Sequence, residues 1–91
     1  MKKRMEAFFT GMVQGVGFRF TVDKIARDYE VGGFVRNLPG GQVELVAEGE
    51  EEVLQEFLAV IRESQMQPYI QDLQVSWKST ENNFQSFTIR A

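Results

Sequence analysis

The stretch Gly11-Met12-Val13-Gln14-Gly15-Val16-Gly17-Phe18-Arg19 separates a short apolar segment from a helical pattern, and it decides how the rest of the chain is interpreted. Glycine has no Cβ atom, so positions 11, 15 and 17 can adopt positive φ angles and turn successive backbone N–H groups toward one point. The helix expected next adds unpaired N–H groups and the positive end of its dipole. Arg19 adds a planar charged fork that matches two phosphate oxygens. The stretch therefore predicts a cradle for an anion such as phosphate.

The glycine spacing also indicates which phosphate ligands do not belong here. The stretch lacks the Gly-Lys-Ser/Thr ending of a nucleotide P-loop, and its glycines do not follow the Gly-x-Gly-x-x-Gly order of a dinucleotide site. A triphosphate or NAD site is therefore disfavoured. Taken alone, the stretch is equally compatible with a tight strand-to-helix turn that carries a surface arginine.

Length and composition narrow the possible chemistry. The 91 residues predict a single domain over 1–91 with one hydrophobic core. The chain has no cysteine and no histidine, which excludes thiolate and imidazole nucleophiles, serine–histidine triads, disulfides and ordinary zinc sites. No segment has the pattern of a signal peptide or approaches the roughly 18 apolar residues of a membrane span. We therefore expect a cytoplasmic protein without a membrane partner.

The charge is unevenly distributed along the chain. Residues 1–40 carry seven Lys/Arg and four Asp/Glu, whereas residues 41–91 carry three and nine. The glycine-rich stretch lies in the positive half, where the local potential favours a small anion. The net charge of −3 argues against a broad nucleic-acid surface.

The hydrophobic periodicity predicts the order strand, helix, strand, strand, helix, strand, with a short strand at the end. We expect strands over 5–10, 33–37, 42–48, 70–78 and 84–90, and helices over 20–30 and 50–64. Phe8 and Phe9 should bury both faces of a central first strand, and Gly32-Gly33 should end the first helix. The order is that of an α+β, ferredoxin-like α/β sandwich (βαββαβ plus a short C-terminal strand), with two helices on one face of an antiparallel sheet. It leaves the pairing of the last strand open.

This topology brings two polar side chains to one edge of the sheet. In a split βαβ unit the first two strands point the same way, so their C-terminal ends lie together. Arg19 follows the first strand, and Asn37 ends the second. With the third strand between them, the two backbones stand about 10 Å apart, a gap that an arginine side chain mostly spans. We expect the Arg19 guanidinium and the Asn37 amide to flank one phosphate-sized volume, although Asn37 in isolation is better explained as a turn residue.

Two segments carry a resemblance to a known family. The stretch 11–19 is similar to the first signature of the acylphosphatase family, small enzymes that hydrolyse carboxyl-phosphate anhydrides. The segment Gly-Phe-Val-Arg-Asn-Leu-Pro-Gly-Gly-Gln-Val at 33–43, followed by Gly49, resembles the second signature. Two departures, Gln42 in place of a small hydroxyl residue and Gln-Pro-Tyr-Ile at 67–70, put loop stability and substrate preference in doubt more than activity.

The resemblance implies hydrolysis of an acylphosphate to a carboxylate and inorganic phosphate, with no metal or other cofactor. Nothing in the sequence requires more than a monomer, although it leaves the oligomeric state open. Arg19 would bind the phosphoryl group and Asn37 would orient the attacking water. The phosphate oxygens would be held by the N–H groups of Gln14, Gly15, Val16, Gly17, Phe18 and Arg19. The chemistry agrees, because phosphoryl transfer depends mainly on charge stabilisation and positioning, and a carboxylate leaves without a strong base. We expect the water proton to pass late, to a phosphate oxygen.

Two non-catalytic alternatives share the expected topology. One is an RNA-binding module of the RRM type, for which the required basic and aromatic string on the third strand is missing. The other is a regulatory domain that binds a small molecule without consuming it. The sequence leaves the physiological acyl group open, with acetyl, carbamoyl and glyceroyl phosphates as candidates.

Overall fold

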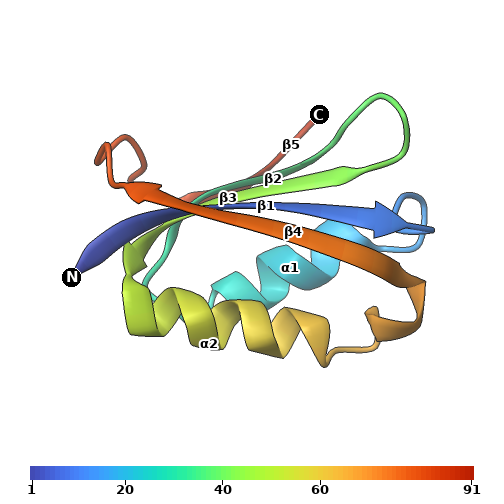
Figure 1. Ribbon diagram of the computed structural model, residues 1–91, viewed down its shortest axis with the longest axis horizontal. Coiled ribbons are helices and arrows are strands. Elements are labelled where there is room, and N and C mark those ends of the chain that lie inside the picture. The colour runs from blue at the N-terminus through green and yellow to red at the C-terminus, as the bar shows by residue number, and fades with distance from the viewer.

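A computed structural model describes residues 1–91 and shows one five-stranded sheet in the order β4-β1-β3-β2-β5. The strands are β1 (Lys2–Gly11), β2 (Gly32–Asn37), β3 (Val43–Glu50), β4 (Ile70–Ser79) and β5 (Phe87–Arg90). The helices are α1 (Phe18–Ala26), α2 (Glu51–Arg62) and the short 3-10 turn η1 (Gln67–Tyr69). Both α1 and α2 cover the same face of the sheet (Figure 1), which confirms the predicted ferredoxin-like α/β sandwich.

The last strand makes the sheet mixed. β4, β1, β3 and β2 pair antiparallel, as predicted, but β5 pairs parallel with β2, from Gly33 opposite Phe87 to Arg36 opposite Arg90. β4 is antiparallel to β1, so it finishes at the end of the sheet where β1 and β2 begin. A chain that crosses from there to the outer side of β2 must run in the same direction as β2. The expectation of a wholly antiparallel sheet is corrected at this one edge.

The first helix differs from the expected range of 20–30. α1 begins earlier because Gly17, with φ 83°, is already its N-cap, and it ends at Ala26, where Arg27 is the C-cap. The two glycines at 32 and 33 do not end this helix but pair with β3 at the start of β2. The other boundaries differ from the expected ones by only a few residues.

The hydrophobic core lies between the sheet and the two helices. It contains alternating residues of β1, including Met5 and Phe9, and the inner faces of the helices, including Val22 and Phe57. Phe9 is completely buried, whereas Phe8 lies on the opposite face and is only half-buried, because no helix covers that face. The prediction that both rings are buried was therefore wrong for Phe8.

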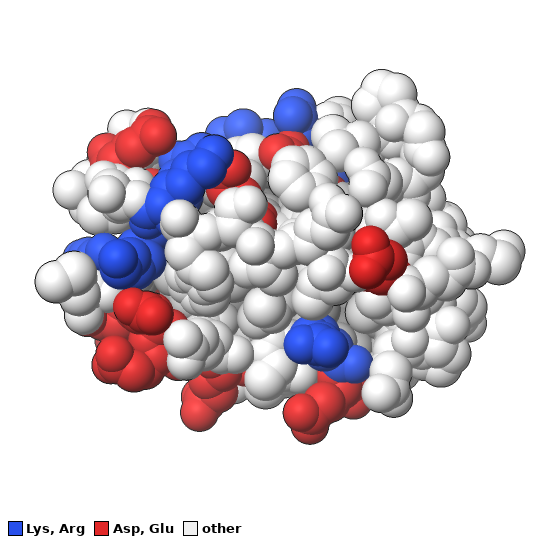
Figure 2. Space-filling model, in the orientation of Figure 1, with Lys and Arg blue, Asp and Glu red and all other residues white.

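Different loops gather at the two ends of the sheet. The loop between β1 and α1 and the turn between β2 and β3 lie together at one end, on the right in Figure 1. The start of α2 and the segment between β4 and β5 lie at the other end. On the face drawn in Figure 2, which has the same orientation, charged side chains of both signs gather toward the second end, and few lie at the first end. Neither α1 nor α2 combines the length and apolar character that crossing a membrane requires.

Candidate active site

The loop before α1 takes its shape from two glycines. Gly15 and Gly17 have φ angles of 79° and 83°, in the left-handed region that other residues rarely adopt. A Cβ atom at either position would meet nothing within 4 Å. Glycine is therefore needed at both positions for its backbone conformation and not for space. Such left-handed residues turn neighbouring N–H groups toward a common side of the loop.

The N-terminus of α1 opens directly from this loop. Its first helical hydrogen bond runs from the Thr21 N–H to the Gly17 carbonyl, over 3.0 Å. No side chain caps the N-terminus, and its first turn contains no acidic residue. The N–H groups of Phe18, Arg19 and Phe20 therefore have no helical acceptor, and the positive end of the dipole faces no carboxylate of its own helix. This geometry suits an anion.

Arg19 extends from that first turn toward the far edge of the sheet. Its Nη1 donates a hydrogen bond to the main-chain carbonyl of Arg90, in β5, over 3.1 Å. Arg90 lies opposite Arg36 in the β2–β5 pairing, and Arg36 is the residue before Asn37. The guanidinium thus reaches the edge of the sheet where β2 ends, the edge that the sequence predicted.

Asn37 is the last residue of β2, and its side-chain oxygen lacks a hydrogen-bond donor. Oδ1 is buried and has no hydrogen-bond partner in the protein. A buried polar atom without a partner costs about 1–3 kcal/mol, and such atoms in folded proteins call for a specific explanation. The simplest one is that Oδ1 accepts a hydrogen bond from a molecule that is not part of the chain.

The side chain of Gln14 ties the loop to the turn that follows Asn37. Its Nε2 donates to the carbonyls of Leu38 and Gln42, each over 2.8 Å. Gln42, the residue that departs from the family pattern, donates from its own side chain to the Thr10 hydroxyl over 3.0 Å. The sequence predicted only a main-chain function for Gln14 and did not reveal this link. The only available signal was a polar amide side chain within a glycine-rich loop.

The remaining predicted residues serve the site through the backbone. The side chain of Phe18 is buried, with its ring 4.8 Å from that of Phe9, so it anchors the start of α1 in the core. Val16 packs partly against the same core, and the two glycines present only main chain. Gln14 and Arg19 make contacts on either side of Asn37. The structure therefore gathers the predicted residues at one edge.

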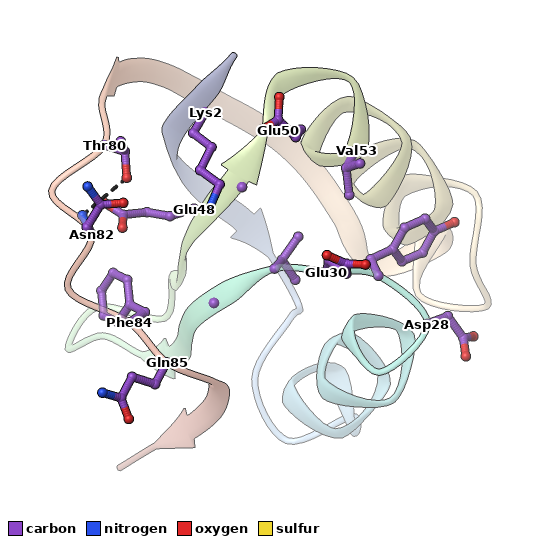
Figure 3. A pocket seen from close by; sticks show the side chains of 14 residues that line it. Lys2, Asp28, Glu30, Glu48, Glu50, Val53, Thr80, Asn82, Phe84 and Gln85 are labelled. Carbon is purple, nitrogen blue, oxygen red and sulfur yellow. Dashed lines mark hydrogen bonds between the residues drawn. The ribbon is translucent and has the colours of Figure 1, made fainter.

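The largest cavity lies elsewhere. It has a volume of about 780 Å³ and is lined at the opposite end of the sheet by residues that include Lys2, Glu30, Glu48 and Glu50 (Figure 3). None of the predicted site residues lines it. Arg19 and Asn37 line neither this cavity nor the next two, of about 690 and 390 Å³.

The fold and the site define a class of protein, a small ferredoxin-like domain with N–H donors, an arginine and an unpaired amide oxygen at one sheet edge. The family model described as acylphosphatase matches residues 5–89, so the chain belongs to the acylphosphatase family.

Individual relatives agree with this assignment over nearly the whole chain. The chain is 35% identical to an acylphosphatase of Archaeoglobus fulgidus over 85 residues, which cover 93% of this chain and 94% of that one. It is 36% identical to an acylphosphatase of Salinibacter ruber over 89 residues, covering 98% and 94%. A crystal structure of acylphosphatase from Bacillus subtilis superposes with a TM-score of 0.90 at 30% identity, covering 98% and 99%. The chain is a hydrolase of carboxyl-phosphate anhydrides and not one of the two non-catalytic alternatives.

Proposed function

We propose that the loop from Gln14 to Arg19, together with Asn37, is the site at which the acylphosphate is hydrolysed. The N–H groups of the loop and of the first turn of α1 bind the phosphoryl oxygens. The Arg19 guanidinium adds the full positive charge, and its fork matches two of those oxygens. These donors are fixed before the substrate arrives, so they stabilise the charge of the transition state without reorganisation.

Asn37 orients the water, and the buried, unpaired Oδ1 is the single observation that carries this assignment. The water donates one hydrogen bond to Oδ1, which leaves its oxygen lone pair directed at phosphorus. The new P–O bond forms as the bond to the acyl oxygen breaks, and the carboxylate leaves with the electron pair. The water proton passes to a phosphate oxygen, so no strong base is needed. The products are a carboxylate and inorganic phosphate.

The experiment that tests this assignment uses Asn37→Ala and benzoyl phosphate, with hydrolysis followed by the loss of the anhydride absorbance. We expect kcat to fall by about 100-fold, since a positioning group contributes on that order. Inhibition by inorganic phosphate should be unchanged, because the phosphate donors remain. Removing a buried atom that has no partner should also leave the melting temperature unchanged or slightly higher. Wild-type kcat in a folded Asn37→Ala variant would reject the water-positioning function.

We also propose an oligomeric state, a location and the partners of the enzyme. Residues 1–91 act as one domain, as a monomer in the cytoplasm, with an acylphosphate substrate and no nucleic-acid or membrane partner. The open face of the sheet supports this, because Glu6 lies there between Arg4 and Lys78 and pairs with both, at 2.9 and 2.8 Å. Such interleaved charges do not form the continuous positive surface that nucleic acid requires. Light scattering tests the monomer, and salt-dependent binding of labelled single-stranded RNA would contradict the partner assignment.

A further inference from the structure

The Arg19 side chain has a single hydrogen-bond partner, the main-chain carbonyl of Arg90. Arg19 takes part in none of the ion pairs of the structure. A guanidinium presents five N–H donors in one rigid plane, so a bond on Nη1 restricts how that plane can turn. The edge formed by Nε and Nη2 keeps its donors free, and that edge can bind two phosphate oxygens side by side.

The side chain of Arg90 is itself held in place. Its guanidinium carbon lies 3.9 Å from the centroid of the Phe34 ring, a close cation–π contact. Phe34 is a fixed platform, because it is 7% exposed and its ring meets that of Phe84 at 5.9 Å. The Arg36 guanidinium lies 5.7 Å from the same ring centroid.

β5 needs such an anchor. It has four residues and pairs on one side only, with β2, and Arg90 forms the last of these pairs. The end of a short edge strand frays readily, because little burial and few hydrogen bonds hold it. Without the contact to Phe34, the Arg90 carbonyl would not be held at a fixed position beside Arg19.

We infer that β5 is part of the catalytic apparatus and that Arg90 is a positioning residue. Its carbonyl orients the Arg19 guanidinium for phosphate, and its side chain, stacked on Phe34, holds the carbonyl in place. The inference rests on the proposed function, since it takes Arg19 as the phosphate-binding side chain. The contact joins residues 71 positions apart and makes the last strand a determinant of activity and not only of the fold.

The test compares truncation after Ile89, which removes the carbonyl and the side chain, with Arg90→Ala, which removes the anchor alone. We expect kcat/KM for benzoyl phosphate to fall about tenfold or more in the truncated chain, since small misplacements of catalytic groups have large effects. In Arg90→Ala, kcat/KM should fall about threefold, which corresponds to the loss of one exposed cation–π contact. Inhibition by inorganic phosphate should weaken in parallel, and Arg90→Lys should recover part of both losses.

Two further variants separate positioning from general stability. Phe34→Leu should reduce kcat/KM like Arg90→Ala, and the losses should not add in the double variant, because each breaks the same contact. Lys78→Ala removes an equal charge from the same face at the opposite edge strand, and its kinetics should match wild type. Arg90 variants with lowered melting temperatures but unchanged kinetics would overturn the inference, as would additive losses. Near-complete loss of activity in Arg19→Ala would then still support the proposed function, whereas an active Arg19→Ala enzyme would reject that function itself.

Discussion

At the end of the sheet where β2 finishes, the Asn37 Oδ1 is buried without a partner, whereas the buried carboxylate at the opposite end, that of Glu48, has hydrogen-bond donors in the protein. One of its oxygens accepts hydrogen bonds from the Glu81 N–H over 2.8 Å and from Arg4 over 3.3 Å. The largest cavity lies at the end with the satisfied groups, and neither it nor the second one, of about 690 Å³ beside the start of β4, is lined by Arg19 or Asn37. In the proposed function, an unsatisfied polar atom therefore indicates the site better than cavity volume does.

The electrostatics of the cavity end are those of a structural network. Burial opposes the ionisation of Glu48, but hydrogen bonds from the Glu81 N–H, the Thr80 hydroxyl and Arg4 outweigh it and lower the pKa of the carboxyl. The pKa of Glu6 is lowered as well, chiefly by its hydrogen bond from Lys78 and then by that from Arg4. These side chains pair with one another and with neighbouring main chain, which stabilises the fold.

The largest expected effect separates the two ends directly. Arg19→Ala should lower kcat/KM by about 100-fold or more, corresponding to about 3 kcal/mol of transition-state stabilisation, with little change in melting temperature. Arg27→Ala is the matched control, because it removes an exposed arginine just beyond α1, 3.0 Å from Asp23. Steady-state kinetics on both purified variants measure the difference. Equal activity of the two variants would contradict the assignment of the reaction to the Arg19 end of the sheet.

The next effect tests the cavity end. Glu48→Gln should lower the free energy of unfolding by about 2 kcal/mol, since it weakens hydrogen bonds to a charged group, and should leave kcat and KM unchanged. Because the folded pKa of Glu48 lies below its ordinary value of 4.5, its stabilisation is present above that pH and is lost as the pH falls through the folded pKa. Denaturant titrations from pH 7 to pH 3 should therefore show a shallower acid loss in Glu48→Gln. A steeper loss, or a kinetic defect, would contradict the structural assignment.

A smaller effect tests the link between the loop and the β2–β3 turn. Gln14→Met keeps the shape of the side chain but removes both donors to the carbonyls of Leu38 and Gln42. Two hydrogen bonds of about 1 kcal/mol each hold this contact, so we expect kcat/KM to fall about tenfold and the stability to fall modestly. Gln55→Met, on the exposed face of α2, is the control. An unchanged kcat/KM for Gln14→Met would show that the loop holds its geometry without this side chain.

The last prediction is that removal of metal ions has no effect on kcat. Incubation with excess EDTA followed by gel filtration should leave kcat unchanged, because Arg19 and main-chain N–H groups supply the positive charge in the proposed mechanism. Loss of activity that returns on addition of Mg²⁺ or Zn²⁺ would show that the mechanism omits a metal.

Local pattern and strand connectivity account for what the sequence could predict. The positions of Arg19 and Asn37 at one sheet edge follow from the direction of β1 and β2, which the right-handed crossover through α1 determines. The left-handed glycines follow from their own chemistry. Neither prediction needs knowledge of distant contacts.

The features that the sequence did not reveal all depend on such contacts. Gln14 bonds to carbonyls 24 and 28 residues away, and Arg19 bonds to a carbonyl 71 residues away. Hydrophobic periodicity contains no information on these polar pairs, or on the partner of a four-residue edge strand. Phe8 was misassigned for a similar reason, because burial of the second sheet face depends on whether another element covers it.

The most direct test of the central claim is a phosphate titration of the ¹⁵N-labelled protein followed by NMR. We expect the largest shifts at the amides of residues 14–20 and at the side-chain amide of Asn37, with a concentration dependence that fits a single site and no change around Gly32 and Gly49 at the cavity end. Shifts centred on the cavity residues, with the loop amides unmoved, would contradict the account.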